Sequence, residues 1–583
     1  MKFHSFLPPA GLPTLMLVGF GAGAAAANFS VAEVPRAIAA AAHCIVANLP
    51  AQALSAEAMK AYEDADPPLW NDLGSLTYPV TTKSSEAQSY FDQGLKLAAN
   101  FNHAEARRAF RKAQRLDPAC AMCFAAEALV LGPNINVPMA PEANPPAFAA
   151  IRKAQELSAG ASDKEKAIIE AVATRYSDDP AAERTALDAA FADATAALSD
   201  KYPDDLELAV LAAEAGMDTQ PWDYWEPGGK LPRGRAADIQ KRLEGVLAKN
   251  PEHPGAMHLY IHLVEASDRP ERAEPYADRL AALMPGAGHI VHMPSHIYHR
   301  IGRYVDSLES NKAASKVDET YIAQTGAVGV YPIGYYSHNI HFVLISAQLL
   351  GDSKTVLAEA DKLDKWLSNE IASAVPIAQP VKAAPYFAWA QYAEPDKILA
   401  MPAPPGAPPY VKAMWHYARG VAFASKKDTA GARTEADAIQ QILQETDWST
   451  MDLWHVPVRP VLEVAHDVVL ARSAQAEGDE SSAIALWQKA AAVEDTIPYM
   501  EPPFWYYPVR QSLGAALLKS GHPEEAEKEF NAALEKARGS AWALYGLEQA
   551  AKARGDAAAQ SKAAEALSKS WLGDPAMLNL ERL

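Results

Sequence analysis

The chain has 583 residues, of which 49% are hydrophobic and 21% are charged. These fractions exclude a disordered polymer, and the length exceeds what one compact core organises, so several domains or one long repeat array is expected. The net charge of −19 is spread along the chain and argues against nucleic acid or anionic lipid as the main partner.

Residues 1–27 predict a signal peptide. Lys2 precedes a short apolar run at residues 12–20, and small residues follow, where an A-x-A cleavage site fits. This run is too short to span a bilayer, and no later stretch approaches a transmembrane helix. We therefore expect an exported, periplasmic protein without a membrane span, in which residues 28–72 form an N-terminal segment. A buried N-terminal helix is the alternative.

The next feature is an internal repeat of the tetratricopeptide type, a 34-residue pair of helices with small residues where they cross. The unit that begins at Ala87 has Gly94 at position 8, Ala106 at 20, Phe110 at 24 and Pro118 at 32. Further copies carry Gly420, Ala432, Ala436 and Ile439; Gly478, Ala483, Trp487 and Ala490; and Gly514, Gly521, Ala526, Phe530 and Ala533. Recurrence at one spacing predicts an all-α, tetratricopeptide-type α-solenoid of stacked helical hairpins.

We divide the array into N-terminal repeats at residues 73–250, central histidine-rich repeats at 251–375 and C-terminal repeats at 376–583. Proline-rich and aromatic segments at residues 220–235, 375–409 and 500–508 interrupt the pattern. Long segments of this kind either form functional rims or pack over the edge of the solenoid.

Cys120 and Cys123 form a C-x-x-C at a hairpin junction. Neither a βαβ pattern nor a following histidine is present, so thioredoxin-like and haem-attachment motifs are not matched. A local disulfide is the favoured interpretation, with inert thiols, metal binding and redox roles as alternatives.

The central repeats hold nine of the sixteen histidines. His258 and His262 form an i, i+4 pair, and His292 and His296 form another exactly one repeat length, 34 residues, further on. Pairs at this spacing share one face of a helix, and equivalent points on adjacent repeats are neighbours in space. The two pairs should therefore lie side by side.

The repeat register predicts which face they occupy. Positions 2, 5, 9 and 12 of the first helix line the concave groove in arrays of this type. His258 and His262 fall at positions 5 and 9, and a third register that places Gly351 at position 15 puts His338 and His341 at positions 2 and 5. Glu265, His289 and His299 fall at the remaining groove positions. The pattern does not determine the register of this third unit uniquely, so the positions given to His338 and His341 depend on the choice of Gly351 as position 15.

So many imidazoles on one face predict a site for one or two transition-metal ions, with zinc, copper and iron all compatible. Structural or pH-sensing histidines are the alternative. Pro294 favours a first helical turn, which would take His289 out of the site. The expected ligands are His258, His262, His292, His296, His338 and His341, with Glu265, His289 and His299 in a second tier.

From about residue 73 onward the chain resembles bacterial tetratricopeptide-repeat proteins of uncertain function, through LGSLTYPV, FNHAEARRAF, LDPACAMC and LGPNIN. The resemblance implies a solenoid with a binding groove, and little about chemistry. Peptide-binding members carry Lys, Arg and Asn at groove positions, where this chain carries His and Glu.

We therefore expect an exported metal-binding solenoid, and whether it is an enzyme stays open. A free metal position would support hydrolysis or oxidation, whereas storage or delivery of metal needs none. A groove that binds a peptide or small molecule, in a non-enzymatic interaction scaffold, is the rival. Tyr331, Tyr335, Tyr336, Trp222 and Trp225 are candidates for a substrate rim.

Overall fold

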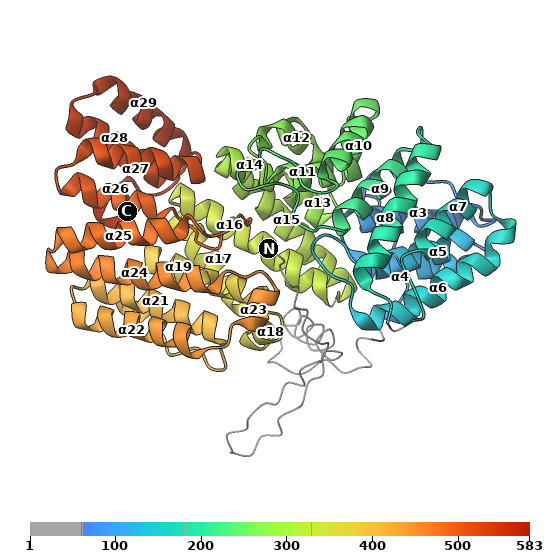
Figure 1. Ribbon diagram of the computed structural model, residues 1–583, viewed down its shortest axis with the longest axis horizontal. Helices are drawn as coiled ribbons and strands as arrows, with labels where there is room; N and C mark the ends of the chain where they lie inside the picture. The colour runs from blue at the N-terminus through green and yellow to red at the C-terminus, as the bar shows by residue number, and fades with distance from the viewer. Residues whose placement is uncertain (1–59, 61, 180, 328) are drawn as a thin grey trace, which may run out of the picture.

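The computed structural model describes residues 60, 62–179, 181–327 and 329–583 (Figure 1). This part of the chain is built from helices and contains no β-strand, only the isolated bridges Asn134–Val137 and Trp225–Pro232. The predicted all-α, tetratricopeptide-type solenoid is confirmed. The export signal and most of the N-terminal segment lie outside the described residues.

The helices follow one another as antiparallel hairpins. The N-terminal ones are α3 (Ser85–Ala99), α4 (His103–Leu116), α5 (Ala121–Leu131), η2 (Pro141–Ala143), α6 (Asn144–Leu157), η3 (Ser158–Gly160), α7 (Asp163–Ala173), α8 (Arg184–Lys201), α9 (Leu206–Asp218) and α10 (Ala236–Lys249). The central ones are α11 (Pro254–Val264), η4 (Pro270–Ala273), α12 (Glu274–Leu283), α13 (Gly288–His292), α14 (Pro294–Ile301), α15 (Tyr304–Thr325), the π-helix η5 (Tyr331–Tyr335), α16 (Tyr336–Leu350) and α17 (Ser353–Trp366).

The C-terminal helices are α18 (Asn369–Ala374), α19 (Ala378–Tyr392), α20 (Pro395–Leu399), α21 (Pro409–Ser425), α22 (Thr429–Glu445), α23 (Ser449–Leu453), α24 (Val458–Glu477), α25 (Glu480–Glu494), α26 (Val509–Lys519), α27 (Pro523–Lys536), α28 (Ala541–Arg554), α29 (Ala557–Ser570), η6 (Pro575–Met577) and η7 (Leu580–Arg582). Much of the proline-rich segment at residues 375–409 is therefore helical, and α19 keeps its helix around the internal Pro385.

The small and aromatic repeat positions pack as the sequence predicts. A Cβ placed on Gly94 would overlap the ring of Phe110, and one on Gly514 would approach the ring of Phe530 to 2.9 Å. Both phenylalanines are fully buried. Position 8 must therefore be small because the aromatic residue at position 24 lies directly against the helix backbone.

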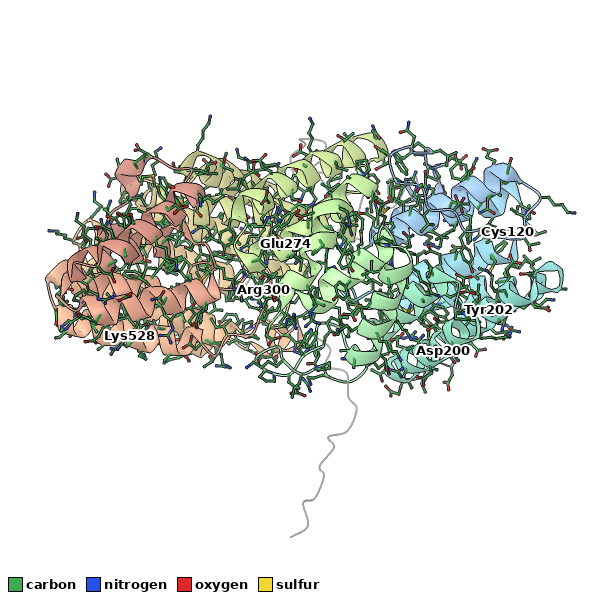
Figure 2. All side chains as sticks on the ribbon, turned by 90° about the horizontal axis from the view of Figure 1, so that it is seen from above. Cys120, Asp200, Tyr202, Glu274, Arg300 and Lys528 are labelled. Carbon is green, nitrogen blue, oxygen red and sulfur yellow. A yellow bond between two sulfur atoms is a disulfide. The ribbon has the colours of Figure 1, made fainter. Side chains whose placement is uncertain are left out.

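The described helices pack around two large apolar clusters. The buried apolar residues form two large clusters, one running from Leu73 to Tyr335 and the other centred on α15 to α28, so the predicted central region contributes to both. In Figure 2 the N-terminal repeats around Cys120 and the C-terminal repeats around Lys528 lie at opposite ends, with Arg300 near the middle.

Direct contacts hold both arms to the central helices. The carbonyl of Ala99, at the end of α3, lies 2.8 Å from Nδ1 of His258 in α11. At the other end, the amide of Leu572 donates to the carbonyl of Leu350 at 2.8 Å. Gly302, with φ 85°, faces the Arg538 backbone so closely that any Cβ would clash, which explains the glycine.

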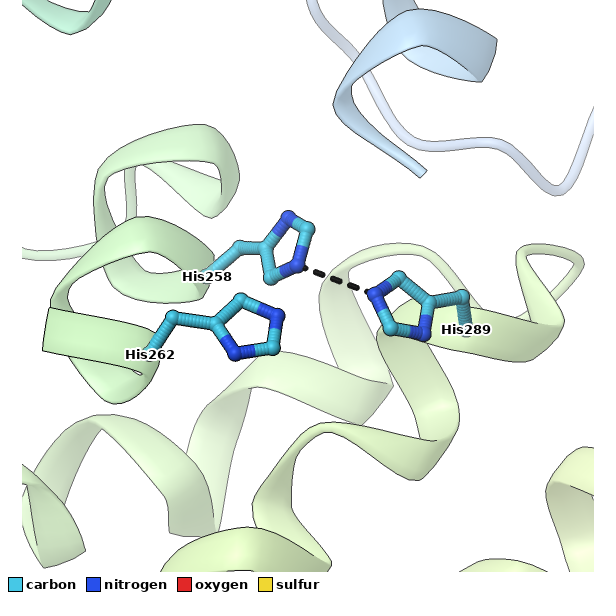
Figure 3. Close-up of side chains that lie close together, drawn as sticks. All are labelled: His258, His262 and His289. Atoms are coloured by element: carbon cyan, nitrogen blue, oxygen red, sulfur yellow. Dashed lines mark hydrogen bonds between the residues drawn. The ribbon is translucent and has the colours of Figure 1, made fainter. Parts of the chain in front are cut away.

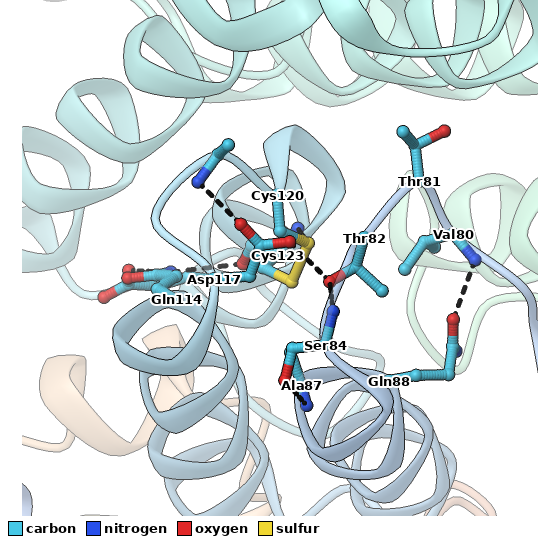
Figure 4. The surroundings of a disulfide bond; sticks show 12 residues. Val80, Thr81, Thr82, Ser84, Ala87, Gln88, Gln114, Asp117, Cys120 and Cys123 are labelled. Carbon is cyan, nitrogen blue, oxygen red and sulfur yellow. Dashed lines mark hydrogen bonds between the residues drawn. A yellow bond between two sulfur atoms is a disulfide. The ribbon is translucent and has the colours of Figure 1, made fainter.

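Cys120 and Cys123 are joined by a disulfide, which confirms the favoured interpretation (Figure 4). Cys120 is the N-cap of α5, and both cysteines are fully buried. Nearby, the Thr82 hydroxyl donates to Asp117 at 2.6 Å and fixes the preceding turn. Along the described stretches, we find no helix with the length and apolar character needed to cross a membrane.

Candidate metal centre

Three consecutive repeats bring the predicted histidines together. His258 and His262 come from α11, which begins with Pro254 directly after the N-cap His253. The next repeat supplies His289 and His292 from the short helix α13 and His296 from α14, and α16 supplies His338. Pro294 does begin α14, as expected, but α13 precedes it and carries His289 into the cluster. The expectation that Pro294 would exclude His289 is therefore wrong.

Six imidazoles form two groups of three, which we call the first triad (His258, His262, His289) and the second triad (His292, His296, His338). Within each triad, one ring nitrogen per residue lies within 4.8 Å of the other two. Figure 3 shows the first triad, in which the Nε2 atoms of His258 and His289 are 3.1 Å apart. In the second triad, Nε2 of His292 lies 2.9 Å from Nε2 of His296.

Glu265 joins the two triads. Its Oε1 lies 2.9 Å from Nδ1 of His262 and its Oε2 lies 2.7 Å from Nδ1 of His296. The carboxylate is fully buried, and the hydroxyl of Tyr499 donates to the same Oε2 at 3.0 Å. Arg300 donates to the backbone carbonyl of Glu265 at 2.7 Å and so holds the end of α11 in place.

The outer nitrogens of two further histidines also face acceptors. Nδ1 of His258 meets the Ala99 carbonyl at 2.8 Å, and Nδ1 of His292 meets Oδ1 of Asn311 at 2.6 Å. The amide orientation of Asn311 is fixed because its Nδ2 donates to the Ser307 carbonyl at 2.7 Å. Carbonyl and carboxylate oxygens only accept hydrogen bonds, so His258, His262, His292 and His296 must all carry a proton on Nδ1.

This protonation leaves the Nε2 atom of each of these four imidazoles with a free lone pair. Between His292 and His296, two such atoms approach to 2.9 Å with no proton between them in the neutral tautomers. In the first triad, His289 has no partner at Nδ1, so it can donate its Nε2 proton to His258. The contact in the second triad therefore requires a cation, either a metal ion or an added proton.

The electrostatics differ between the imidazoles of the cluster. Burial, together with the neighbouring histidines, lowers the pKa of His258, His289 and His292 well below the usual range. Burial also disfavours the charged form of His296, but the carboxylate of Glu265 outweighs it and raises the pKa of His296. The pKa of Glu265 is lowered by its two imidazole partners despite its burial. The cluster is thus a set of mainly neutral imidazoles around one fixed negative charge, which favours the charged form of His296.

Two predicted ligands lie outside the triads. His299 lies about one turn beyond His296 on α14, and its Nδ1 lies 3.0 Å from Glu501. His341 lies about 60° around α16 from His338, and its Nε2 lies 3.0 Å from the hydroxyl of Tyr506. The structure places both beside the loop between α25 and α26 instead of in the triads.

The site is enclosed, although the sequence pattern suggested an open groove. The five histidines of α11, α13 and α14 in the triads are at most 2% exposed. Phe101 stacks on the first triad, with its ring centroid 4.5 Å from that of His258, and Phe342 lies 4.9 Å from His292. Phe101, Asn311 and Tyr499 were missed by the sequence analysis because no motif connects them with the histidines.

Of the predicted rim residues, two contact the cluster. Trp222 meets His262 edge-on at 5.2 Å between centroids, and Tyr335 lies 4.7 Å from His289. The other three have different roles. Trp225 donates to the Leu263 carbonyl, Tyr331 accepts from the amide of His289, and Tyr336 donates to Glu319.

No family model matches this chain, and no curated protein matches it. Among solved structures, the Cut9–Hcn1 complex of APC/C shares 10% identity with TM-score 0.29, covering 83% of this chain and 76% of that one. Yeast Tom70 shares 11% with TM-score 0.25, covering 84% and 92%. The P58(IPK) TPR domain shares 13% with TM-score 0.19, covering 81% and 99%. The likeness is one of fold, and none of their partners transfers to this chain.

Proposed function

We propose that this protein binds transition-metal ions in the two imidazole triads, one ion in each. The observation that carries the proposal is the 2.9 Å approach of two Nε2 lone pairs, those of His292 and His296, whose Nδ1 protons are both engaged elsewhere. A metal ion between such atoms converts an unfavourable contact into two coordinate bonds. An imidazole with a lowered pKa, such as that of His292, is ready to coordinate without first losing a proton, whereas His296, whose pKa Glu265 raises, would release its added proton when the metal binds.

The donor set and its surroundings fit this role. A tetrahedral ion with nitrogen ligands at 2.0–2.1 Å separates its ligand atoms by roughly 3.3 Å, a few tenths of an ångström from the 2.9 and 3.1 Å found here. Metal-bound histidines usually donate their outer N–H to a carboxylate or carbonyl, as His258, His262 and His296 do. An all-imidazole shell suits zinc, copper or iron.

A site with three protein ligands leaves a position for water or substrate, which is the arrangement of catalytic metals. We therefore favour a metal-dependent hydrolase or oxidase over a storage or delivery protein. In either chemistry, Glu265 orients one imidazole of each triad, and the surrounding aromatic rings exclude bulk water. A peptide scaffold would use the same solenoid, but histidines at most 2% exposed offer little surface to a peptide.

The proposed location is the periplasm, after export. The buried Cys120–Cys123 disulfide is in keeping with an oxidising compartment. Fractionation of cells, followed by N-terminal sequencing of the mature protein, tests this part. A chain that keeps its first 27 residues and stays in the cytosol would contradict it.

The metal content of untagged protein is the decisive measurement. Inductively coupled plasma mass spectrometry should find two ions per chain in the wild type. One ion should remain in each of the double variants His258→Ala/His262→Ala and His292→Ala/His296→Ala. His416→Ala/His466→Ala is the matched control, because Nδ1 of each of these histidines also faces a carboxylate, Glu435 and Asp467 respectively. All variants require unchanged far-ultraviolet circular dichroism.

Absence of metal from folded wild-type protein, even after reconstitution with zinc, copper and iron, would overturn the proposal. The added proton on His296 would then account for the close nitrogen contact. The interaction scaffold would become the leading function, and the search would turn to peptide partners.

A further inference from the structure

Helices of the N-terminal repeats, together with α11, form a partly open apolar cavity of about 130 Å³. It is lined by α3, α5, α7, α9 and α11, which are every second α-helix along this part of the array. Apolar side chains dominate the lining, among them Phe91, Met122, Leu129, Ile168, Leu208 and Leu211. An apolar cavity of about 150 Å³ is large enough for one benzene ring.

This cavity adjoins the first triad through one of its three members. His258 and Phe101 both belong to its lining. Phe101 also stacks on the triad, at 4.5 Å from His258 and 5.4 Å from His289 between ring centroids. A molecule in the cavity therefore lies against the imidazole whose Nε2 belongs to the proposed metal site.

The lining also contains one carboxyl group without a committed partner, that of Glu214 in α9. The other polar side chains are engaged, since the Tyr78 hydroxyl donates to Asp205 at 2.9 Å and Glu207 lies 3.0 Å from His253. In the described part of the chain, no hydrogen bond reaches Glu214. Desolvation of this partly buried side chain and the nearby Asp218 raise its pKa, so the group offers a hydrogen bond more readily than a full charge.

We propose that this cavity binds a small neutral aromatic alcohol, with phenol as the simplest member. The ring fills the apolar space, the hydroxyl pairs with Glu214, and the ligand is held beside the first triad. A ligand with its own negative charge is disfavoured, because burying a charge in an apolar cavity has a high desolvation cost. Binding of the alcohol does not depend on the proposed function. Only the statement that the ligand lies beside a bound metal rests on it.

Binding is tested with 4-fluorophenol followed by ¹⁹F NMR on the full-length, metal-free protein. Saturable binding of one molecule per chain is expected, with 4-fluorobenzoate at least 10-fold weaker. Ala126→Phe and Ala98→Phe, each of which puts a ring into the cavity, should abolish binding. The control Ala186→Phe, on the exposed start of α8, should not alter it.

Glu214→Leu tests the polar contact separately from the cavity. Loss of one hydrogen bond should weaken 4-fluorophenol roughly 2- to 10-fold and leave fluorobenzene unchanged. No saturable binding by folded wild-type protein would overturn the proposal. Equal binding by the cavity-filled variants would also overturn it, since the probe would then be bound elsewhere.

The same probe separates this inference from the proposed metal site. With Cu²⁺ bound, the ¹⁹F signal of the bound ligand should broaden strongly, because the cavity adjoins the first triad. Binding in the metal-free protein together with no metal uptake would retain the cavity and reject the metal centre. Metal uptake without 4-fluorophenol binding would retain the metal centre and reject the cavity as a binding site.

Discussion

The hydroxyl of Tyr499 donates to Oε2 of Glu265 at 3.0 Å, although 234 residues separate the two along the chain. The same oxygen lies 2.7 Å from Nδ1 of His296. The loop between α25 and α26 therefore reaches the carboxylate that joins the two triads. A group contributed by the C-terminal repeats thus helps to fix the orientation of ligands in the central ones.

Glu265→Gln should weaken metal binding about 10- to 100-fold, the usual effect of losing a carboxylate that orients a metal-bound histidine. The glutamine amide would present an N–H group to one of the two imidazole N–H groups, so one hydrogen bond is lost. Competition against a chelator of known affinity measures the change. Glu244→Gln is the control, because Glu244 accepts from Tyr260 at 3.0 Å away from the triads. Equal affinities in the two variants would count against Glu265.

His338→Ala and His341→Ala form a matched pair on α16. The first removes a member of the second triad, so we expect about one ion fewer per chain by mass spectrometry. The second removes the partner of Tyr506 and should leave the metal content unchanged. If His341→Ala lost the ion and His338→Ala kept it, the predicted register at position 5 would be right and the triad assignment wrong.

The metal-free protein should lose stability in mild acid. Burial lowers the pKa of His341 from its ordinary 6.5 to about 3. Below pH 6.5, therefore, His341 is protonated in the unfolded chain but stays neutral in the folded one. The contribution of His341 to the free energy of unfolding is complete above pH 6.5. It is lost as the pH falls toward 3, at up to about 1.4 kcal/mol per pH unit.

Thermal unfolding between pH 7 and pH 5, in the presence of chelator, checks this effect. His341→Leu should flatten the decline in melting temperature, because the leucine has no proton to take up. His522→Leu, at a half-exposed site, should keep the wild-type decline. An identical pH profile in wild type and His341→Leu would refute the assignment.

Replacing two helical glycines by alanine should change the stability of the protein in opposite directions. Gly94→Ala drives a methyl group into Phe110 and should cost about 1–3 kcal/mol. Gly245→Ala, in α10, meets nothing within 4 Å and should stabilise the protein by up to about 1 kcal/mol. Differential scanning calorimetry of both variants measures the effects. Stabilisation by Gly94→Ala would contradict this prediction, because it would mean that α3 and α4 can move apart to accommodate the methyl group.

The repeat register could be read from the sequence because it depends on local spacing. Gly94 with Phe110 and Gly514 with Phe530 keep the same distance in the chain and the same contact in space. That periodicity also placed His258, His262, His292 and His296 correctly on neighbouring helices. It did not reveal that a loop from another part of the chain reaches His341 on α16.

The partners of the imidazoles could not be predicted in the same way. Ala99 and Asn311 lie 159 and 19 residues from the histidines they contact. Neither residue type indicates an imidazole partner, and the contacts depend on how the arms curl around the centre. Burial of the site could not be predicted for the same reason, because Phe101, which packs against the first triad, belongs to the N-terminal repeats.

In most arrays of this kind each repeat touches only its neighbours, so repeats can be gained or lost at an end. Here the end of α3 contacts His258, and the segment between α25 and α26 contacts Glu265. Removing either arm would strip a partner from the centre as well as the packing of the arm itself. The number of repeats is therefore fixed by the geometry of the histidine cluster, and insertions should be tolerated only in turns that face away from it.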